Sequence, residues 1–139
     1  MNRIMITGCN GQLGRALNQL YEKETGITLI NTDVFHGEGI TSLDITDVGT
    51  VLSFVREMKP DAIINCAAHT NVDKCETDMD NAFKINAVGP RNLSIAAAEI
   101  GAKLMHVSTD YVFPGTEARA LTEFDMVGPT SMYGKTKLA

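Results

Sequence analysis

The sequence lacks a long apolar run and has only three cysteines. The odd cysteine number and the absence of a Cys-x-x-Cys spacing argue against a disulfide framework and favour reduced thiols in a cytoplasmic protein. The apolar stretch at the N-terminus is interrupted by Arg3 and is too short for a secretion signal or a membrane span. His36, His69 and His106 show no paired spacing with the cysteines, so the sequence predicts no metal site.

Positive charge is also scarce, with 12 Lys and Arg against 17 Asp and Glu and a formal net charge of −5. The basic residues are scattered, which argues against a nucleic-acid partner. Any phosphate must therefore be held mainly by backbone amides and helix ends. With 139 residues, 44% of them apolar, and no repeat or low-complexity tract, the chain is expected to be one soluble globular domain.

Segments with strand and helix patterns alternate along the chain. Strands are expected over Arg3–Thr7, Ile27–Asn31, Ala62–Asn65 and Lys103–Ser108. Helices are expected over Gly11–Glu24, Asp47–Met58, Thr77–Ile100 and from Ser131 to Lys137. The alternation predicts an α/β fold, a doubly wound parallel Rossmann-like sheet with helices on both faces. The spacing of Thr77 and Asp80 suggests a capping box at the start of the long third helix.

A glycine-rich turn follows the first expected strand. The residues Gly8-Cys9-Asn10-Gly11-Gln12-Leu13-Gly14 read as Gly-x-x-Gly-x-x-Gly. Glycines allow close backbone approach, and the helix that opens within the motif presents unpaired N–H groups to a pyrophosphate. A tight turn without a ligand is the alternative, but the strand before the motif and the helix after it favour dinucleotide binding.

Asp33 lies 19 residues after Gly14, just beyond the second expected strand. A carboxylate at this distance can accept hydrogen bonds from both ribose hydroxyls of an adenosine and repel a 2′-phosphate. No arginine lies in the segment 33–37 to bind such a phosphate. The pattern therefore favours NADH over NADPH, the alternative being a solvated aspartate that caps a turn.

Tyr133 and Lys137 form a Tyr-x-x-x-Lys pair near the end of the sequence. Positions i and i+4 share one face of a helix, so both side chains can point into one cleft. A phenol alone exchanges protons poorly at neutral pH, and a nearby ammonium makes it more effective by stabilising the phenolate. Taken alone, the spacing is more typical of an amphipathic helix start with an exposed lysine, which is the role expected for Lys135.

Thr109 is the candidate for a second hydrogen-bond donor to a carbonyl oxygen that gains charge during reduction. It follows the last expected strand, at the carboxyl edge where parallel sheets place their active sites. Judged without the other motifs, a role in capping the loop after that strand is equally compatible with this position.

Longer runs of residues identify a family. They are Leu43–Asp47, Asn65–Lys74, Asn86-Ala87 and Ser108–Gly115, in addition to the glycine turn and the Tyr-Lys pair. The Ala-Ala-His-Thr-x-Val-Asp and Ser-Thr-Asp-Tyr-Val-Phe runs are more specific than any dinucleotide motif. Over essentially its whole length the chain resembles the N-terminal part of the extended short-chain dehydrogenase/reductases, most closely the dTDP-4-dehydrorhamnose reductase family.

The resemblance implies roles for individual residues. Those implied as catalytic are Thr109, Tyr133 and Lys137. Those implied to bind the dinucleotide are Gly8, Asn10, Gly11, Gln12, Leu13, Gly14, Asp33, Asp44, Ile45, Ala67, Ala68, Thr70, Tyr133 and Lys137. Those implied to touch the sugar nucleotide are Val72, Thr109 and Tyr111. For His69 a structural role is favoured.

The implied reaction is hydride transfer from NADH or NADPH to C4 of dTDP-4-dehydro-6-deoxy-L-mannose, which gives dTDP-L-rhamnose, a nucleotide sugar of cell-wall polysaccharide. Some family members are magnesium-dependent homodimers, although no residue here indicates a metal ligand. Because the family has further strands and a smaller substrate domain, residues 1–139 are expected to be a truncated NAD(P)-binding domain. Such a piece should bind dinucleotide and turn over little.

Three other functions stay open to different degrees. A sugar-nucleotide dehydratase is disfavoured because Tyr111 follows Thr109-Asp110 where dehydratases carry a glutamate. Another reductase or a 4-epimerase of the superfamily is the enzymatic alternative. A non-catalytic protein like the regulatory subunit of methionine adenosyltransferase is the alternative from another class, although the catalytic set is intact.

Overall fold

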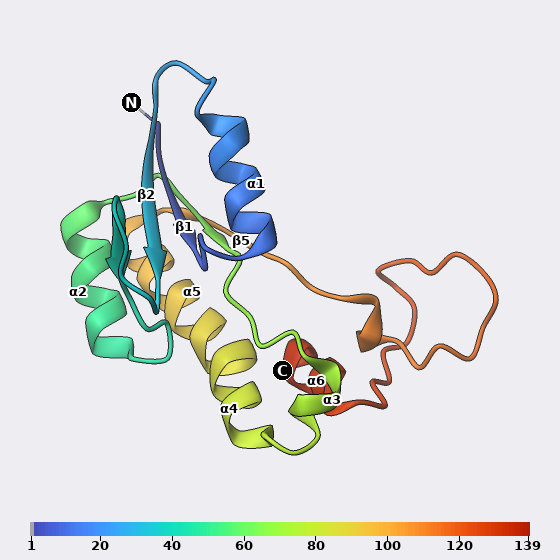
Figure 1. Cartoon of the computed structure of the whole chain (residues 1–139). Helices are drawn as coiled ribbons and strands as arrows, with labels where there is room; N and C mark the ends of the chain where they lie inside the picture. Colours follow the sequence, from blue (N-terminus) through green and yellow to red (C-terminus); the bar gives the residue numbers. More distant parts are fainter. Residues whose placement is uncertain (1) are drawn as a thin grey trace.

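In the computed structural model, which describes residues 2–139, a five-stranded parallel sheet forms the centre of the chain (Figure 1). The strands are β1 (Asn2–Thr7), β2 (Ile27–Asp33), β3 (Ile40–Ser42), β4 (Ala62–Asn65) and β5 (Lys103–His106). Their order is β3-β2-β1-β4-β5. The chain therefore builds outward from β1 in one direction and then in the other, which is the doubly wound arrangement that the sequence predicts.

Helical segments connect the strands and extend the chain beyond β5. They are α1 (Gln12–Tyr21), α2 (Val48–Met58), α3 (Val72–Cys75), α4 (Met79–Phe83), the π-helical η1 (Lys84–Val88), α5 (Gly89–Ile100), the 3₁₀ turn η2 (Asp110–Val112) and α6 (Met132–Leu138). Among residues 2–139 there is no helix with the length and apolar character needed to cross a membrane.

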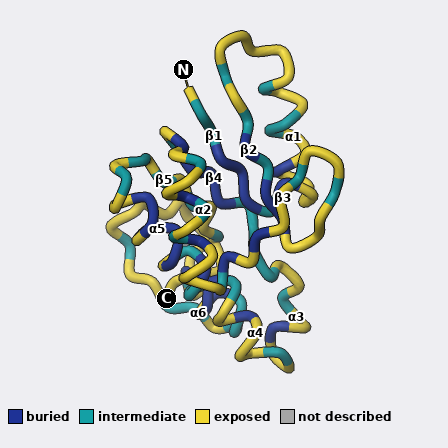
Figure 2. Tube along the Cα trace, turned by 90° about the vertical axis from the view of Figure 1, so that its left-hand side faces the viewer, coloured by how far each residue is buried: buried dark blue, intermediate teal, exposed yellow. Residues whose placement is uncertain are grey.

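The main core lies between the sheet and the helices α2 and α5. Met5 and Ile63 from the central strands meet Val51 and Val55 of α2 and Leu93 of α5, all of them fully buried. In Figure 2 the buried parts of the trace run along β1 and β4. On the other face, α1 is thinly packed: Gly14 is its one buried residue, so this face is the less stabilised of the two.

The predicted helix over Thr77–Ile100 is in fact three consecutive segments, α4, η1 and α5. The suggested capping box is wrong, because the Thr77 hydroxyl donates to the carbonyl oxygen of Lys74 at 3.2 Å and α4 begins only after Asp78. The π-helical segment contains Asn86, whose amide bonds to two other parts of the chain. Such insertions are common where a helix positions a functional side chain.

Strand boundaries also differ from the predictions. The sequence did not predict β3, which has only three residues, too few to show an alternating pattern. β2 runs on to Asp33, so this carboxylate is the last residue of the strand. β5 ends at His106, which leaves Ser108 and Thr109 in the loop beyond the sheet.

Candidate active site

The glycine turn joins β1 to α1 with very little space. Gly8 has φ of +63°, and a Cβ there would lie 2.7 Å from the backbone N and Cα of Ala67. A Cβ at Gly14 would lie 2.6 Å from the Cα of Cys9. Gly11 caps α1 and has no side chain to block the amides of the first turn. The turn therefore needs glycine for backbone conformation and packing, and it leaves the helix N-terminus accessible.

Asp33 ties the glycine turn to the end of β2. Its carboxylate accepts hydrogen bonds from the backbone N–H of Asn10 at 3.1 Å and of Phe35 at 3.2 Å. The residue is 8% exposed and lines a cavity of about 230 Å³ together with Asp44 and Ile45. Each carboxylate oxygen keeps a free lone pair, so the geometry is compatible with further acceptance from a ligand hydroxyl.

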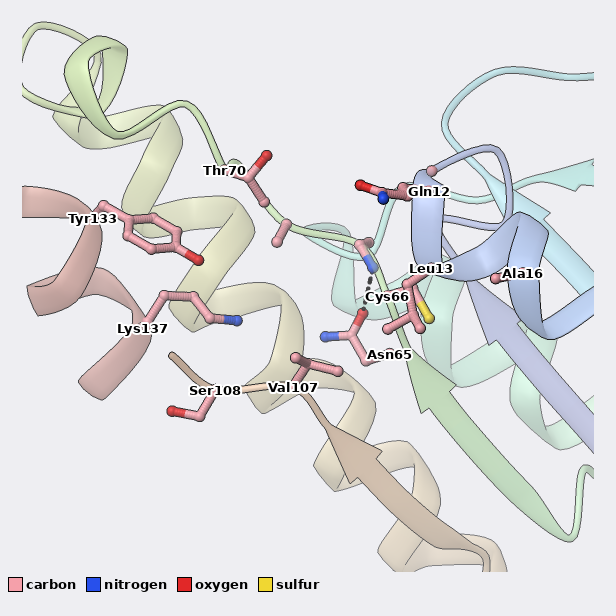
Figure 3. A pocket seen from close by; sticks show the side chains of 13 residues that line it. Gln12, Leu13, Ala16, Asn65, Cys66, Thr70, Val107, Ser108, Tyr133 and Lys137 are labelled. Atoms are coloured by element: carbon pink, nitrogen blue, oxygen red, sulfur yellow. Dashed lines mark hydrogen bonds between the residues drawn. The ribbon is translucent and has the colours of Figure 1, made fainter. Parts of the chain in front are cut away.

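A second cavity of about 550 Å³ lies beyond the glycine turn (Figure 3). The two cavities share Gly11, Cys66, Ala67 and Ala68. The residues that line only the larger one are Gln12, Leu13, Ala16, Asn65, Thr70, Val107, Ser108, Tyr133 and Lys137. The cavities therefore adjoin along the shared residues, with Asp33 at the smaller one and the Tyr-Lys pair at the larger one.

Tyr133 and Lys137 lie one turn apart on α6, and both side chains point into the larger cavity (Figure 3). The helix begins after Ser131, whose hydroxyl accepts the N–H of Gly134 at 3.0 Å. Lys137 is only 9% exposed, and its Nζ lies 3.1 Å from Nε2 of His106 on β5. Burial lowers the pKa of Lys137 below the usual lysine value. The pKa of His106 is lowered as well, chiefly by burial.

Two of the predicted dinucleotide contacts have other roles in the structure. The side chain of Asn10 lines neither cavity, and its backbone N–H holds Asp33. Gly14 is buried beneath the turn, where it allows α1 to pack closely. The other predicted dinucleotide-binding residues all line one cavity or both.

The residues expected to touch the substrate are not among those that line these cavities. The Thr109 hydroxyl donates to Oδ1 of Asp110 at 3.1 Å and accepts the N–H of Tyr111 at 3.3 Å, so that it caps η2. This is the loop-capping arrangement that was the alternative role for Thr109. The ring of Tyr111 packs edge-on against the ring of Tyr133, with centroids 5.6 Å apart. Val72 is the first residue of α3 and is partly buried.

A buried amide network holds α6 in position. Asn86 donates to the carbonyl oxygen of His69 and to the hydroxyl of Thr136, each at 3.0 Å. Its own Oδ1 accepts the N–H of His69 at 2.8 Å. The His69 ring contacts the Cys75 thiol and the Asp78 carboxylate, which is the structural role favoured from the sequence. Asn86 thus fixes the loop after β4 against the helix that carries the Tyr-Lys pair.

Sequence reasoning missed several residues that line the larger cavity. Ser108 does so where Thr109 was expected, and Asn65 and Cys66 form part of its floor. The signal for Ser108 was its position at the same strand end as Thr109, one residue earlier. The three cysteines are all free thiols. Residues 2–139 contain no cluster of three or more His, Cys, Asp or Glu side chains that could hold a metal ion.

A parallel doubly wound sheet, a glycine turn over a helix N-terminus and a Tyr-Lys pair in the same cleft are typical of Rossmann-like reductases. The chain belongs to the family described as the RmlD substrate binding domain, whose model matches residues 1–139. The resemblance read from the sequence motifs is thereby confirmed.

Individual relatives agree with the family. The chain is 41% identical over 138 residues to a dTDP-4-dehydrorhamnose reductase of Streptomyces griseus. The matched region covers 99% of this chain and 43% of that protein. A crystal structure of a dTDP-4-dehydrorhamnose reductase from Clostridium acetobutylicum is 52% identical, with a TM-score of 0.90 over 98% of this chain and 46% of that one. The enzyme from Bacillus anthracis, solved in complex with NADP, is 41% identical, with a TM-score of 0.86 over 99% of this chain and 47% of that one. The chain thus spans less than half the length of each of these relatives.

Proposed function

We propose that residues 1–139 form the dinucleotide-binding and catalytic part of an NAD(P)H-dependent reductase. Its reaction is reduction of the 4-keto group of dTDP-4-dehydro-6-deoxy-L-mannose to give dTDP-L-rhamnose, with Thr109, Tyr133 and Lys137 as the catalytic set. One observation carries the proposal: Tyr133 and Lys137 point into the same cavity that Gly11, Gln12 and Leu13 line. The relatives named dTDP-4-dehydrorhamnose reductase support the choice of substrate.

The described residues fit a nicotinamide dinucleotide. Gly8 and Gly11 leave room beside the N-terminus of α1, where amides suit a pyrophosphate, and Asp33 suits a ribose. The bound dinucleotide supplies the hydride. The Tyr133 phenol donates its proton to the oxygen of the reduced carbonyl, and the Lys137 ammonium stabilises the phenolate that remains. For Thr109 to donate to the same oxygen, its hydroxyl must turn away from Asp110.

We infer further properties that follow from this function. Residues 1–139 would act as an NAD(P)-binding domain that binds dinucleotide well and turns over slowly by itself, because the residues expected to touch the sugar line neither cavity. A cytoplasmic location is proposed from the three free cysteines, and a homodimer from the family resemblance. A magnesium requirement rests on that resemblance alone.

Replacement of Lys137 tests the proposed function, and replacement of Lys135 on the same helix is the control. We expect Lys137→Met to abolish stoichiometric NADH oxidation with the dTDP-ketosugar, because the buried ammonium is lost from the cavity. Lys135→Met should leave oxidation unchanged, because Lys135 is exposed on the other face of α6. The measurement is the loss of NADH absorbance with protein in excess over NADH. Equal rates in the two variants would contradict the assigned role, and NADH binding without oxidation in the unmodified protein would favour a non-catalytic binding function.

Asp33 should determine the preference between NADH and NADPH. We expect the unmodified chain to bind NADH more tightly, because the carboxylate repels a 2′-phosphate at close range. In Asp33→Asn the dissociation constant for NADPH, divided by that for NADH, should fall roughly tenfold. The reason is that the repulsion of the 2′-phosphate is lost, while one oxygen that can accept a hydrogen bond is kept. Fluorescence titration with both dinucleotides measures the ratio. Asp44→Asn removes the same charge from the same cavity, and a change in the ratio as large as that of Asp33→Asn would refute the specific role of Asp33.

A further inference from the structure

Three polar side chains form a row across the carboxyl ends of neighbouring strands. The strand register pairs Thr7 of β1 with Asn65 of β4, and Asn65 with His106 of β5. The Thr7 hydroxyl donates to Oδ1 of Asn65 at 2.5 Å, and Nδ2 of Asn65 lies 3.0 Å from Nδ1 of His106. The row ends at Lys137, whose Nζ lies 3.1 Å from Nε2 of the same ring.

The direction of each hydrogen bond in this row is determined by one backbone amide. The N–H of Ala67 can only donate, and it points to Oδ1 of Asn65 at 3.1 Å. The other end of the Asn65 amide is therefore the NH₂ group, and turning the amide over would set two donors against each other. Since Nδ2 donates to His106, Nδ1 of the ring must accept and carries no proton.

A neutral histidine with an unprotonated Nδ1 carries its proton on Nε2. That N–H faces Lys137, and an ammonium has three donors and no lone pair to accept it. An uncharged amine does have a lone pair. Among the hydrogen bonds of residues 2–139 the contact with His106 is the only one made by Nζ, and none of the ion pairs includes Lys137. The donor pattern is therefore satisfied throughout only when Lys137 is an amine.

We propose that His106 is a positioning residue that holds Lys137 as an uncharged amine while the cleft is empty, so that dinucleotide binding is coupled to uptake of one proton at Nζ. The coupling to a dinucleotide rests on the proposed function, whereas the state of the empty cleft does not. Uptake forms one new N–H bond at Nζ with a proton from the buffer. The lone pair that accepted the hydrogen bond from the Nε2–H group of His106 is used in that new bond. Lys137 is therefore released from His106. Acceptor oxygens and negative charge brought by the dinucleotide favour the ammonium.

Other titratable groups around Lys137 leave this assignment intact. Tyr133 lies one turn before Lys137 on α6, and His106 of β5 is a titratable residue in contact with Lys137. On the α3 side of the helix, Glu76 accepts the N–H of Met132 at 2.8 Å. Cys66 lines the same cavity, and burial raises the pKa of its thiol, so it stays neutral at mildly alkaline pH.

The state of His106 is tested directly in the unmodified chain. Long-range ¹H–¹⁵N NMR spectra of the imidazole nitrogens distinguish the two neutral tautomers from the protonated ring, and the signals lost in His106→Gln assign the residue. At neutral pH we expect the neutral ring of His106 with its proton on Nε2. A ring protonated on Nδ1, or on both nitrogens, would overturn the proposal, and this result does not depend on whether the chain binds any dinucleotide.

Proton uptake is tested by calorimetric titration with NADH in buffers of different ionisation enthalpy. At about pH 8.5, above the ordinary range for histidine, the unmodified chain should take up protons as NADH binds, to a limit of one per NADH. NADH affinity should fall as pH rises, by up to tenfold per unit, between the Lys137 pKa values of the empty and occupied cleft. Uptake of no proton by a chain that binds NADH would overturn the coupling. Failure to bind NADH at all would instead count against the proposed function.

A matched pair of histidine variants separates this role from a structural one. His106→Gln offers Lys137 an accepting oxygen in place of the N–H donor, so proton uptake should be largely lost while NADH still binds. His36→Gln makes the same substitution at an exposed position, and uptake should be retained. Unfolding curves verify that both variants fold. If uptake in a folded His106→Gln chain equals that of His36→Gln, His106 does not set the charge of Lys137.

Discussion

Tyr133→Phe should lower the rate of NADH oxidation with the dTDP-ketosugar by about 10²- to 10⁴-fold, the range typical for loss of a positioned proton donor. The substitution removes only the hydroxyl that points into the larger cavity. The ring remains, and with it the edge-on contact to Tyr111 that helps to hold α6 against η2. NADH affinity should therefore change little, and the loss should appear in the chemical step.

The measurement compares single-turnover rates with protein in excess, in this chain and in a chimera in which it replaces the matched part of the Clostridium acetobutylicum relative. Tyr21→Phe, at the end of α1 and away from both cavities, is the control for loss of a phenolic hydroxyl. A Tyr133→Phe rate equal to that of Tyr21→Phe would show that another group donates the proton. NADH affinity lost along with the rate would indicate that the hydroxyl acts in binding.

Much of the fold and of the cleft could be predicted from the sequence because both depend on local patterns. Short apolar strands alternate with amphipathic helices, and this alternation determines a parallel sheet with its functional loops at one edge. The glycine turn and the Tyr-Lys pair lie about 120 residues apart. They still meet in one cleft, because the carboxyl ends of β1, β4 and β5 lie side by side at that edge.

The contacts that tune the cleft could not be predicted in the same way. Asn65 and His106 become neighbours only through the register of β4 and β5, and a shift by one residue would place them on opposite faces. Asn86 joins His69 to Thr136 from within a π-helical segment, for which the sequence has no periodic signal. The direction of the Thr109 hydroxyl depends on Asp110, its immediate neighbour, and motif matching contains no information on that choice.

Gly134→Ala should disrupt the cleft more than its conservative character suggests. Gly134 lies in α6 between Tyr133 and Lys137, and a Cβ there would overlap the backbone carbonyl oxygen of Tyr111. It would also lie 3.0 Å from Cβ of Pro129. A backbone atom cannot move aside as a flexible side chain can, so α6 itself must shift. We expect a loss of stability of about 1–3 kcal/mol, the usual cost of overpacking, with displacement of both catalytic side chains.

Gly49→Ala provides the matched control, because it makes the same substitution within another helix. A Cβ at Gly49 of α2 would meet only Oδ1 of Asp47, at an ordinary distance of 3.4 Å. Alanine should therefore raise the free energy of unfolding by about 0.4–1 kcal/mol, since it restricts the unfolded chain without a clash. Urea unfolding measures both changes, and NADH titration and oxidation show whether the cleft survives. Opposite signs for the two variants, with NADH oxidation lost only in Gly134→Ala, would establish that close approach of α6 to η2 aligns Tyr133 and Lys137. A Gly134→Ala chain as stable and as active as Gly49→Ala would show that α6 can be displaced without consequence, and that the Tyr-Lys pair does not need this packing.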